Sequence, residues 1–397
     1  MKIRKLLLAA GVFLLTPALC MANQGNVCNT MSEDIVFASR QYSLMLDQIG
    51  RKGAVRIPKT IDKMSRMVYI PTDDWCSGFF AGSLYYLYRL TNDKSWLQQS
   101  KRFTEVLDSI QYLKWHHDVG FMIGSSYLNN YRLQPTKAYK KVIIQTAKSL
   151  CTRFRKGAGV IQSWNTDKGW QSKRGWTCPV IIDNMMNLEL LFEATRLSGD
   201  STFWNVAVAH ADATLKNQFR PDGSCYHVVD YNPTTGEVLH RQTAQGYADN
   251  SAWARGQAWA VYGYTTCYRY TRNKKYLDRA VASLNFIMHN KNLPDDLVPY
   301  WDFDAPNIPN EPRDASSAAC VASALYEMNE YLPDSGYATL ADRIMQSLST
   351  PEYRAPLGKN GCFLLMHSVG SIPHNNEIDV PLNYADYYFL EALTRRK

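Results

Sequence analysis

Apolar residues recur at helical spacing along most of the chain, in segments separated by short polar stretches. This periodicity is typical of amphipathic helices, and several polar stretches carry residues that start or stop a helix. We predict twelve helical segments, near residues 31–50, 77–91, 94–111, 118–130, 135–154, 180–198, 200–218, 251–272, 274–290, 314–331, 336–349 and 380–394.

A recurring junction indicates how these segments are connected. A capping residue is followed three positions later by an aromatic residue in the pairs Asp93/Trp96, Thr136/Tyr139, Asp200/Phe203, Asn273/Tyr276 and Asp334/Tyr337. Such caps accept hydrogen bonds from the first backbone N–H groups of a helix, and short polar connections favour helical hairpins. Twelve helices in paired hairpins can close into a double ring of six inner and six outer helices. An open superhelical array is the alternative.

The two most apolar segments, 180–198 and 251–272, favour the closed ring, because a helix in an open array keeps one face in water. The first of them reads VIIDNMMNLELLFEATRLS, with apolar residues on most of its circumference. Pro179 suits the first position of a helix, which makes Thr177 or Cys178 the predicted cap.

Three polar residues interrupt the start of this apolar segment: Asp183, Asn184 and Asn187. At spacings of three and four they share one face of a helix. A carboxylate in such a position is costly unless something compensates its charge. A hydrogen bond to neighbouring backbone is the structural interpretation, and a catalytic role is the functional one.

The N-terminus has the pattern of a signal peptide. Three cations within the first five residues precede the apolar run Leu6–Leu15, which is too short for a permanent membrane span, and Cys20-Met21-Ala22 offers small residues for cleavage. We therefore predict that residues 1–22 direct export to the periplasm and that residues 23–397 form one domain. A lipid anchor on Cys20 is the alternative, although the bulky Leu19 disfavours it.

Composition narrows the possible partners. Without the three cations of the signal segment, the formal charge falls from +8 to +5, and no basic run indicates nucleic-acid binding. No other segment resembles a membrane span. The nine cysteines include no Cys-x-x-Cys pair and no Cys/His spacing typical of zinc, so we expect mostly buried thiols and no metal. The 10 Trp and 25 Tyr residues favour a site lined by aromatic rings.

Polar and aromatic residues gather in two long connections, 155–179 and 219–250, and loops of this length are usually functional. Polar and aromatic residues also stand at the predicted starts of two helices. Asp118, in HHDVGFM, could simply cap its helix. Arg255 lies between Trp253 and Trp259, and a guanidinium between two rings suits a sugar acid, although packing alone could explain all three.

These motifs together resemble one family. HHDVGFM (116–122), IIDNMMNLELL (181–191), QGYADNSAWARGQAWAVYG (245–263) and NNEIDVPLNYADYYFLEAL (375–393) are similar to glycoside hydrolase family 88, the unsaturated glucuronyl hydrolases. The likeness extends over essentially the whole chain after the signal segment. It implies an all-α (α/α)6 barrel and a catalytic pair that falls on Asp118 and Asp183.

The same resemblance implies which residues contact the substrate and how they act. The contacts fall on Trp75, His117, Trp164, His227, Gln245, Trp253, Arg255 and Trp259, with Trp170 as the alternative to Trp164. Asp183, among apolar neighbours, is expected to be the acid/base. Asp118, beside His117 in a loop, is expected to bind a ring hydroxyl and to stabilise charge, and His227 to hold water or a hydroxyl.

The implied reaction is hydration of the C4=C5 double bond of an unsaturated uronic acid at the non-reducing end of chondroitin, hyaluronan or heparin fragments, without a cofactor. Two alternatives remain at this stage. One is an unsaturated rhamnogalacturonyl hydrolase, which the aspartate pair disfavours. The other is a non-catalytic glycan-binding protein built from helical hairpins.

Overall fold

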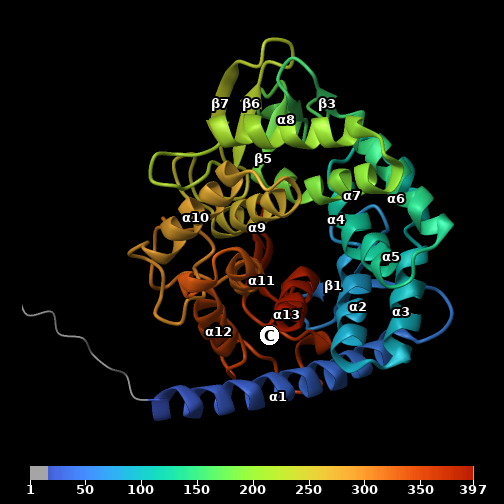
Figure 1. The fold of residues 1–397 in the computed structure, drawn as a ribbon, viewed down its shortest axis with the longest axis vertical. Helices are drawn as coiled ribbons and strands as arrows, with labels where there is room; N and C mark the ends of the chain where they lie inside the picture. The colour runs from blue at the N-terminus through green and yellow to red at the C-terminus, as the bar shows by residue number, and fades with distance from the viewer. Residues whose placement is uncertain (1–16, 397) are drawn as a thin grey trace, which may run out of the picture.

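A closed double ring of helices forms the body of the molecule (Figure 1). The computed structural model describes residues 17–396. Its α-helices are α1 (Pro17–Ile49), α2 (Phe79–Thr91), α3 (Lys94–Glu105), α4 (Val119–Ile123), α5 (Asn129–Leu133), α6 (Lys137–Cys151), α7 (Leu188–Ser198), α8 (Ser201–Asn217), α9 (Ala254–Thr271), α10 (Lys274–Met288), α11 (Ala315–Tyr331), α12 (Tyr337–Leu348) and α13 (Asn383–Arg395).

The inner ring runs from α2 through the α4–α5 segment, α7, α9 and α11 to α13, which packs back against α2. A π-helical turn, Gly124–Leu128, joins α4 to α5. Helices α9, α11 and α13 are buried along nearly their whole length, as expected for helices enclosed by an outer layer. The outer helices α3, α8, α10 and α12 pack on their preceding inner helices. The prediction of an (α/α)6 barrel is confirmed.

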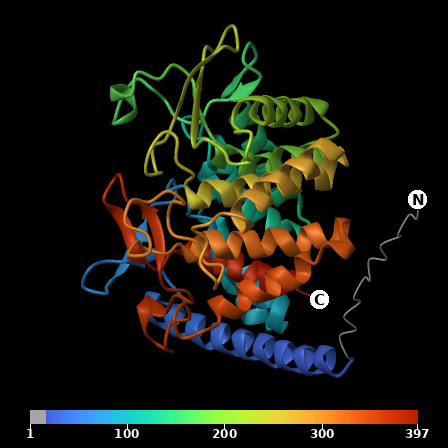
Figure 2. The same cartoon turned by 90° about the vertical axis from the view of Figure 1, so that its left-hand side faces the viewer.

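Four small antiparallel sheets stand on the ring, mostly at one end (Figure 2). Their strands are β1 (Ile57–Ile61), β2 (Met67–Ile70), β3 (Phe154–Arg155), β4 (Val160–Ile161), β5 (Pro179–Ile181), β6 (Val228–Tyr231), β7 (Val238–Gln242), β8 (Ser368–Ser371) and β9 (Asn376–Val380). Both long connections contribute strands, which the helical periodicity did not predict. The β1–β2 and β8–β9 hairpins lie in contact with each other.

The predicted helix at 180–198 begins later than expected. Pro179–Ile181 is strand β5, Ile182–Asn187 is a 3₁₀ turn, and the α-helix starts only at Leu188. The Asp230 carboxylate accepts the backbone N–H groups of Thr177 and Cys178, and β5 then pairs with β6. A short apolar run fits a buried strand as well as a helix, so periodicity could not separate the two.

Four of the five predicted helix caps are confirmed. Asp93, Thr136, Asp200 and Asn273 cap their helices through side-chain hydrogen bonds, whereas Asp334 does not, because α12 starts after Gly336.

The seven cysteines whose side chains are described are free thiols, and all but Cys151 are buried. Residues 1–16 of the predicted signal peptide lie outside the described residues, and residues 17–22 begin α1. Within the described chain, no helix combines the length and the apolar character that crossing a membrane requires.

Candidate active site

Asp118 precedes α4 at the end of the ring that carries the hairpins, and it does not cap that helix through its side chain. Its carboxylate instead faces two histidines: Oδ2 lies 3.2 Å from Nδ1 of His116, and Oδ1 lies 3.3 Å from Nε2 of His117. The two imidazole rings are stacked. The capping interpretation of Asp118 therefore fails, and its carboxylate remains available for chemistry.

Asp183 is held at the start of the 3₁₀ turn, where the chain leaves β5. The β5–β6 pairing fixes the chain on one side of it, since Ile182 donates its backbone N–H to the His227 carbonyl. Asp183 is only 9 % exposed, and its Oδ2 atom has no hydrogen-bond partner among the described residues. Buried polar atoms are almost always paired, so this oxygen is available to bind substrate or water.

His227 approaches Asp183 from the neighbouring strand, with Nε2 at 3.7 Å from Oδ2. Its Nδ1 atom accepts the backbone N–H groups of Ala244 and Gln245 at 3.0 and 3.2 Å. Burial lowers the pKa of His227 to about 3, so the ring is neutral and its single proton is on Nε2. The N–H donor beside Asp183 therefore belongs to a histidine whose tautomer is fixed by two backbone hydrogen bonds.

Both carboxyl groups hold their protons more tightly than an exposed aspartate. Burial raises the pKa of Asp183 to about 7, while the Arg255 guanidinium and the Trp259 indole N–H oppose that shift. Burial raises the pKa of Asp118 well above its usual range, and the charge of Asp183 raises it further. The two groups therefore titrate as a coupled pair.

Asp118 is more deeply buried than its place in a loop indicated. The sequence contrasted Asp118, in a loop beside His117, with Asp183 among apolar neighbours. Asp118 is 7 % exposed, as buried as Asp183, and the pKa of each flanking histidine is lowered by burial, so both rings are neutral. Each carboxyl group has a cation that favours its ionised form, because the Arg255 guanidinium lowers the pKa of Asp183 and the Arg153 guanidinium lowers the pKa of Asp118.

A pair of asparagines, which the sequence analysis noted but did not assign to the site, connects the two aspartate segments. Asn187 donates to Oδ1 of Asn184 at 3.0 Å and lies 3.5 Å from Nδ1 of His117. Its own Oδ1 accepts the backbone N–H of Phe121 in α4. The predicted shared face of Asp183, Asn184 and Asn187 was the available signal for this network.

Arg255 differs most from its expected role. The terminal nitrogens of its guanidinium already bond the Asp314 carboxylate at 3.1 Å and the backbone carbonyls of Val369 and Gly370. The side chain is 1 % exposed and stacks over Trp253 and Tyr384. Arg255 thus ties the β8–β9 hairpin to the ring and supplies positive charge near Asp183, while direct binding of a sugar carboxylate stays a prediction.

The predicted aromatic contacts fall into two groups. Trp253 and Trp259 are almost fully buried, with Trp253 against the His227 ring and Trp259 against Phe121. Trp75 also contacts Phe121 but is only half-buried. Of these three rings, Trp75 can therefore present the most surface to a sugar, and the other two shape the site from behind.

Gln245 and Trp164 lie farther out, where they line a small cavity of about 180 Å³. Trp170, Ser371, His374 and Asn376 complete its lining. The Trp164 and Trp170 rings contact each other at 5.1 Å, so both alternatives border the same cavity. Gln245 donates to the Gly370 carbonyl, which links this cavity to the hairpin held by Arg255.

Comparisons with known proteins show the family of this chain. A sequence model of Glycosyl Hydrolase Family 88 matches residues 52–391. The chain is 46 % identical over 347 residues to an unsaturated glucuronyl hydrolase of Formosa agariphila, covering 87 % of this chain and 86 % of that one. It is 31 % identical over 377 residues to an unsaturated chondroitin disaccharide hydrolase of Streptococcus agalactiae, covering 92 % and 91 %.

Solved structures are similar over the same length. The crystal structure of an unsaturated glucuronyl hydrolase specific for heparin is 43 % identical, with a TM-score of 0.88, and the match covers 93 % of this chain and 97 % of that one. The enzyme from Bacillus sp. GL1, described as responsible for the degradation of glycosaminoglycan, is 29 % identical with a TM-score of 0.83, covering 92 % and 96 %.

Proposed function

Because this chain belongs to glycoside hydrolase family 88, we propose that it is an unsaturated glucuronyl hydrolase acting on glycosaminoglycan fragments left by lyases. It removes the 4,5-unsaturated uronic acid at the non-reducing end. The observation that carries the proposal is the buried pair Asp118/Asp183 beside the Nε2–H group of His227. Family membership and the names of the relatives support the reaction class.

The substrate sugar is a vinyl ether, in which the ring oxygen feeds electrons into the C4=C5 double bond. A carboxylic acid delivers a proton to C4, and the positive charge develops at C5 and on the ring oxygen. Water then adds to C5 and gives its proton to the resulting carboxylate, which restores the acid. Asp183, with a pKa near 7, can both give and take a proton at neutral pH.

Cleavage follows from this hydration. The product at C5 is a hemiketal, which opens to a ketone and breaks the bond between C5 and the ring oxygen. The anomeric carbon is then a hemiacetal, which collapses to an aldehyde and expels the neighbouring sugar with its own oxygen. The neutral His227 donates its Nε2–H to the water or to a ring hydroxyl, and Asp118 holds a ring hydroxyl.

The deciding experiment follows loss of the ultraviolet absorbance of the conjugated double bond. The panel contains unsaturated disaccharides of heparin, chondroitin and hyaluronan, and heparin comes first because the heparin-specific enzyme is 43 % identical. Turnover of at least one disaccharide supports the proposal. Binding of all three without turnover contradicts it.

We also propose that the protein is exported to the periplasm after removal of residues 1–22, with lipid attachment at Cys20 as the second possibility. The charged start and apolar run of the N-terminus support export. The intact mass of the protein from fractionated cells tests it. A chain starting after Ala22 supports cleavage, and an added lipid mass on Cys20 supports the anchor.

A further inference from the structure

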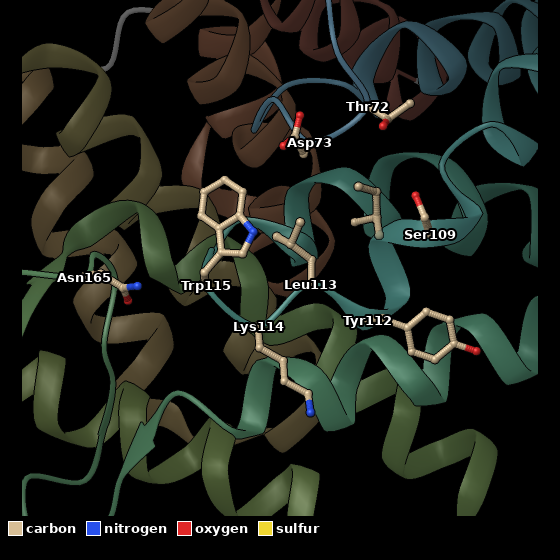
Figure 3. Close-up of a pocket in the computed structure, with 9 residues that line it drawn as sticks. Thr72, Asp73, Ser109, Tyr112, Leu113, Lys114, Trp115 and Asn165 are labelled. Atoms are coloured by element: carbon tan, nitrogen blue, oxygen red, sulfur yellow. The ribbon is translucent and has the colours of Figure 1, made fainter. Parts of the chain in front are cut away.

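A wide groove runs beside the active site, and none of the predicted substrate contacts lies in it. It has a volume of about 740 Å³ and is lined by Thr72, Asp73, Ser109, Ile110, Tyr112, Leu113, Lys114, Trp115 and Asn165 (Figure 3). In that view Trp115 and Leu113 lie between Asp73 on one side and Asn165 and Lys114 on the other. The volume is typical of a ligand site.

The groove lies beside the active site, because neighbouring residues of the same three segments line the two. Asp73 is two residues before Trp75, Trp115 is three residues before Asp118, and Asn165 follows Trp164. The Trp115 ring also contacts the His116 ring, which itself faces the Asp118 carboxylate. The Trp115 wall of the groove is therefore close to the Asp118 carboxylate.

Its two aromatic residues are unusually exposed for side chains of their size. Tyr112 is 63 % and Trp115 is 53 % exposed, whereas most other rings of this protein are buried. Exposed rings surrounded by hydroxyl, amide and charged groups suit a sugar, which offers an apolar face for stacking and a polar edge for hydrogen bonds.

A buried cation lies beneath the groove, and an exposed one lines it. Arg153 is 3 % exposed and donates to the Lys114 carbonyl at 2.9 Å and to Oδ1 of Asn165 at 3.1 Å, so it joins two walls of the groove. The charge of Arg153 lies near the Asp118 carboxyl group and lowers its pKa, while the exposed Lys114 and the carboxylate of Asp73 both line the groove. The Lys114 ammonium group can attract a uronic acid or sulfate group.

We infer that this groove binds the reducing-side sugars of acidic oligosaccharides longer than a disaccharide, with Trp115 and Tyr112 as stacking surfaces. The inference rests on the proposed function, because it places the unsaturated end of the same chain at Asp118 and Asp183. It predicts that the enzyme distinguishes an unsaturated tetrasaccharide from a disaccharide through residues remote from the reacting carbons.

The kinetic test compares the two substrates from one glycosaminoglycan with four variants: Tyr112→Ala, Trp115→Ala, Trp115→Phe and Trp170→Ala. We expect each alanine change in the groove to lower kcat/KM for the tetrasaccharide about tenfold, mainly through KM, which corresponds to loss of one ring contact. The disaccharide should change less than twofold, and Trp115→Phe should retain most of the tetrasaccharide activity. Trp170→Ala instead removes an exposed ring from the cavity beside Gln245, and it tests whether the chain runs through that cavity.

The opposite results are equally distinct. An unchanged tetrasaccharide rate in folded Tyr112→Ala and Trp115→Ala, or equal losses for both substrates, overturns the inference. If only Trp170→Ala lowers the tetrasaccharide rate, the chain runs instead through the cavity of Gln245 and His374.

A binding measurement separates the groove from the reaction. Titration of the tetrasaccharide into Asp183→Asn, with and without Trp115→Ala, should show about tenfold weaker binding for the double variant. Equal affinities contradict the groove even if the enzyme is active. A wild-type enzyme that turns over no disaccharide contradicts the proposed function, while this titration still decides the groove.

Discussion

Nε2 of His227 lies 3.7 Å from Oδ2 of Asp183, and the backbone N–H groups bound to Nδ1 leave the ring proton on Nε2. This relationship gives a carboxyl group of raised pKa a fixed N–H donor at its edge. Asp183 and water can thus exchange a proton next to a group that orients the water. The pH dependence of the reaction should reflect Asp183 and not His227.

The pH profile is the first prediction. The pKa of Asp183 is about 7, so the protonated acid is lost as pH rises through 7. We expect kcat/KM to fall about tenfold per pH unit above that point. The pKa of His227 is about 3, so its protonation should not affect the rate between pH 5 and 7. A rate that rises steadily from pH 6 to 9 contradicts this assignment.

The second prediction concerns Asp183→Asn. An amide is nearly isosteric with the carboxyl group but cannot deliver a proton, so we expect kcat to fall about 10²–10⁴-fold with the fold intact. Circular dichroism checks the fold, and loss of ultraviolet absorbance measures the rate. A near wild-type rate would remove Asp183 from the acid/base role.

The same substitution should increase stability at neutral pH, because it removes a buried carboxylate. The folded-state pKa of Asp183 is raised, so the native protein binds more protons than the unfolded chain between pH 4 and 7, and stability falls as pH rises through that interval. Asp183→Asn removes this loss. We expect a gain of about 1–3 kcal/mol in unfolding free energy at pH 8 that shrinks toward pH 4. Urea unfolding at both pH values measures it, and a gain independent of pH contradicts the linkage.

Part of this site could be predicted from the sequence, and the reasons for the rest are physical. Asp118 and Asp183 follow from motifs, and the ring follows from helical periodicity and caps such as Asp93 and Thr136. The strand at Pro179 could not be predicted, because the strand with which it pairs, β6, is distant in the sequence. The Asp230 carboxylate, which accepts the backbone N–H group of Thr177 just before the strand, lies about fifty residues away. Local patterns carry no information about such long-range pairing.

The lack of long-range information in local patterns also explains why the partners of Arg255 could not be predicted. Its position between two tryptophans indicated a free guanidinium fork, but the carboxylate and carbonyls that occupy its terminal nitrogens come from Asp314 and the β8–β9 hairpin. The burial of Asp118 was missed for a related reason. Asp118 follows two histidines in a short segment before α4, and only the closed ring shows that this segment is covered.

The fourth prediction tests Arg255. In Arg255→Lys a point charge replaces a planar fork, and one ammonium group cannot hold Asp314 and both carbonyls together. We expect kcat/KM to fall about 10–100-fold because the hairpin that positions Gln245 shifts. Retention of a positive charge should keep the pKa of Asp183 near 7, so the pH profile should keep its shape. Wild-type kinetics in Arg255→Lys would show that the fork is not needed.

The last prediction concerns the order of bond changes. If protonation at C4 and addition of water at C5 come first, oxygen from labelled water enters at C5 of the uronic acid, and the released sugar keeps its glycosidic oxygen. The anomeric carbon is not attacked, so α- and β-linked unsaturated sugars should both react. Saturated glucuronides, which lack the double bond, should be inert even if they bind. Mass spectrometry and carbon NMR of the products locate the label. Label at the anomeric carbon, or rapid hydrolysis of a saturated glucuronide, would assign Asp118 and Asp183 to ordinary glycosidase chemistry, in which one carboxyl group protonates the leaving oxygen.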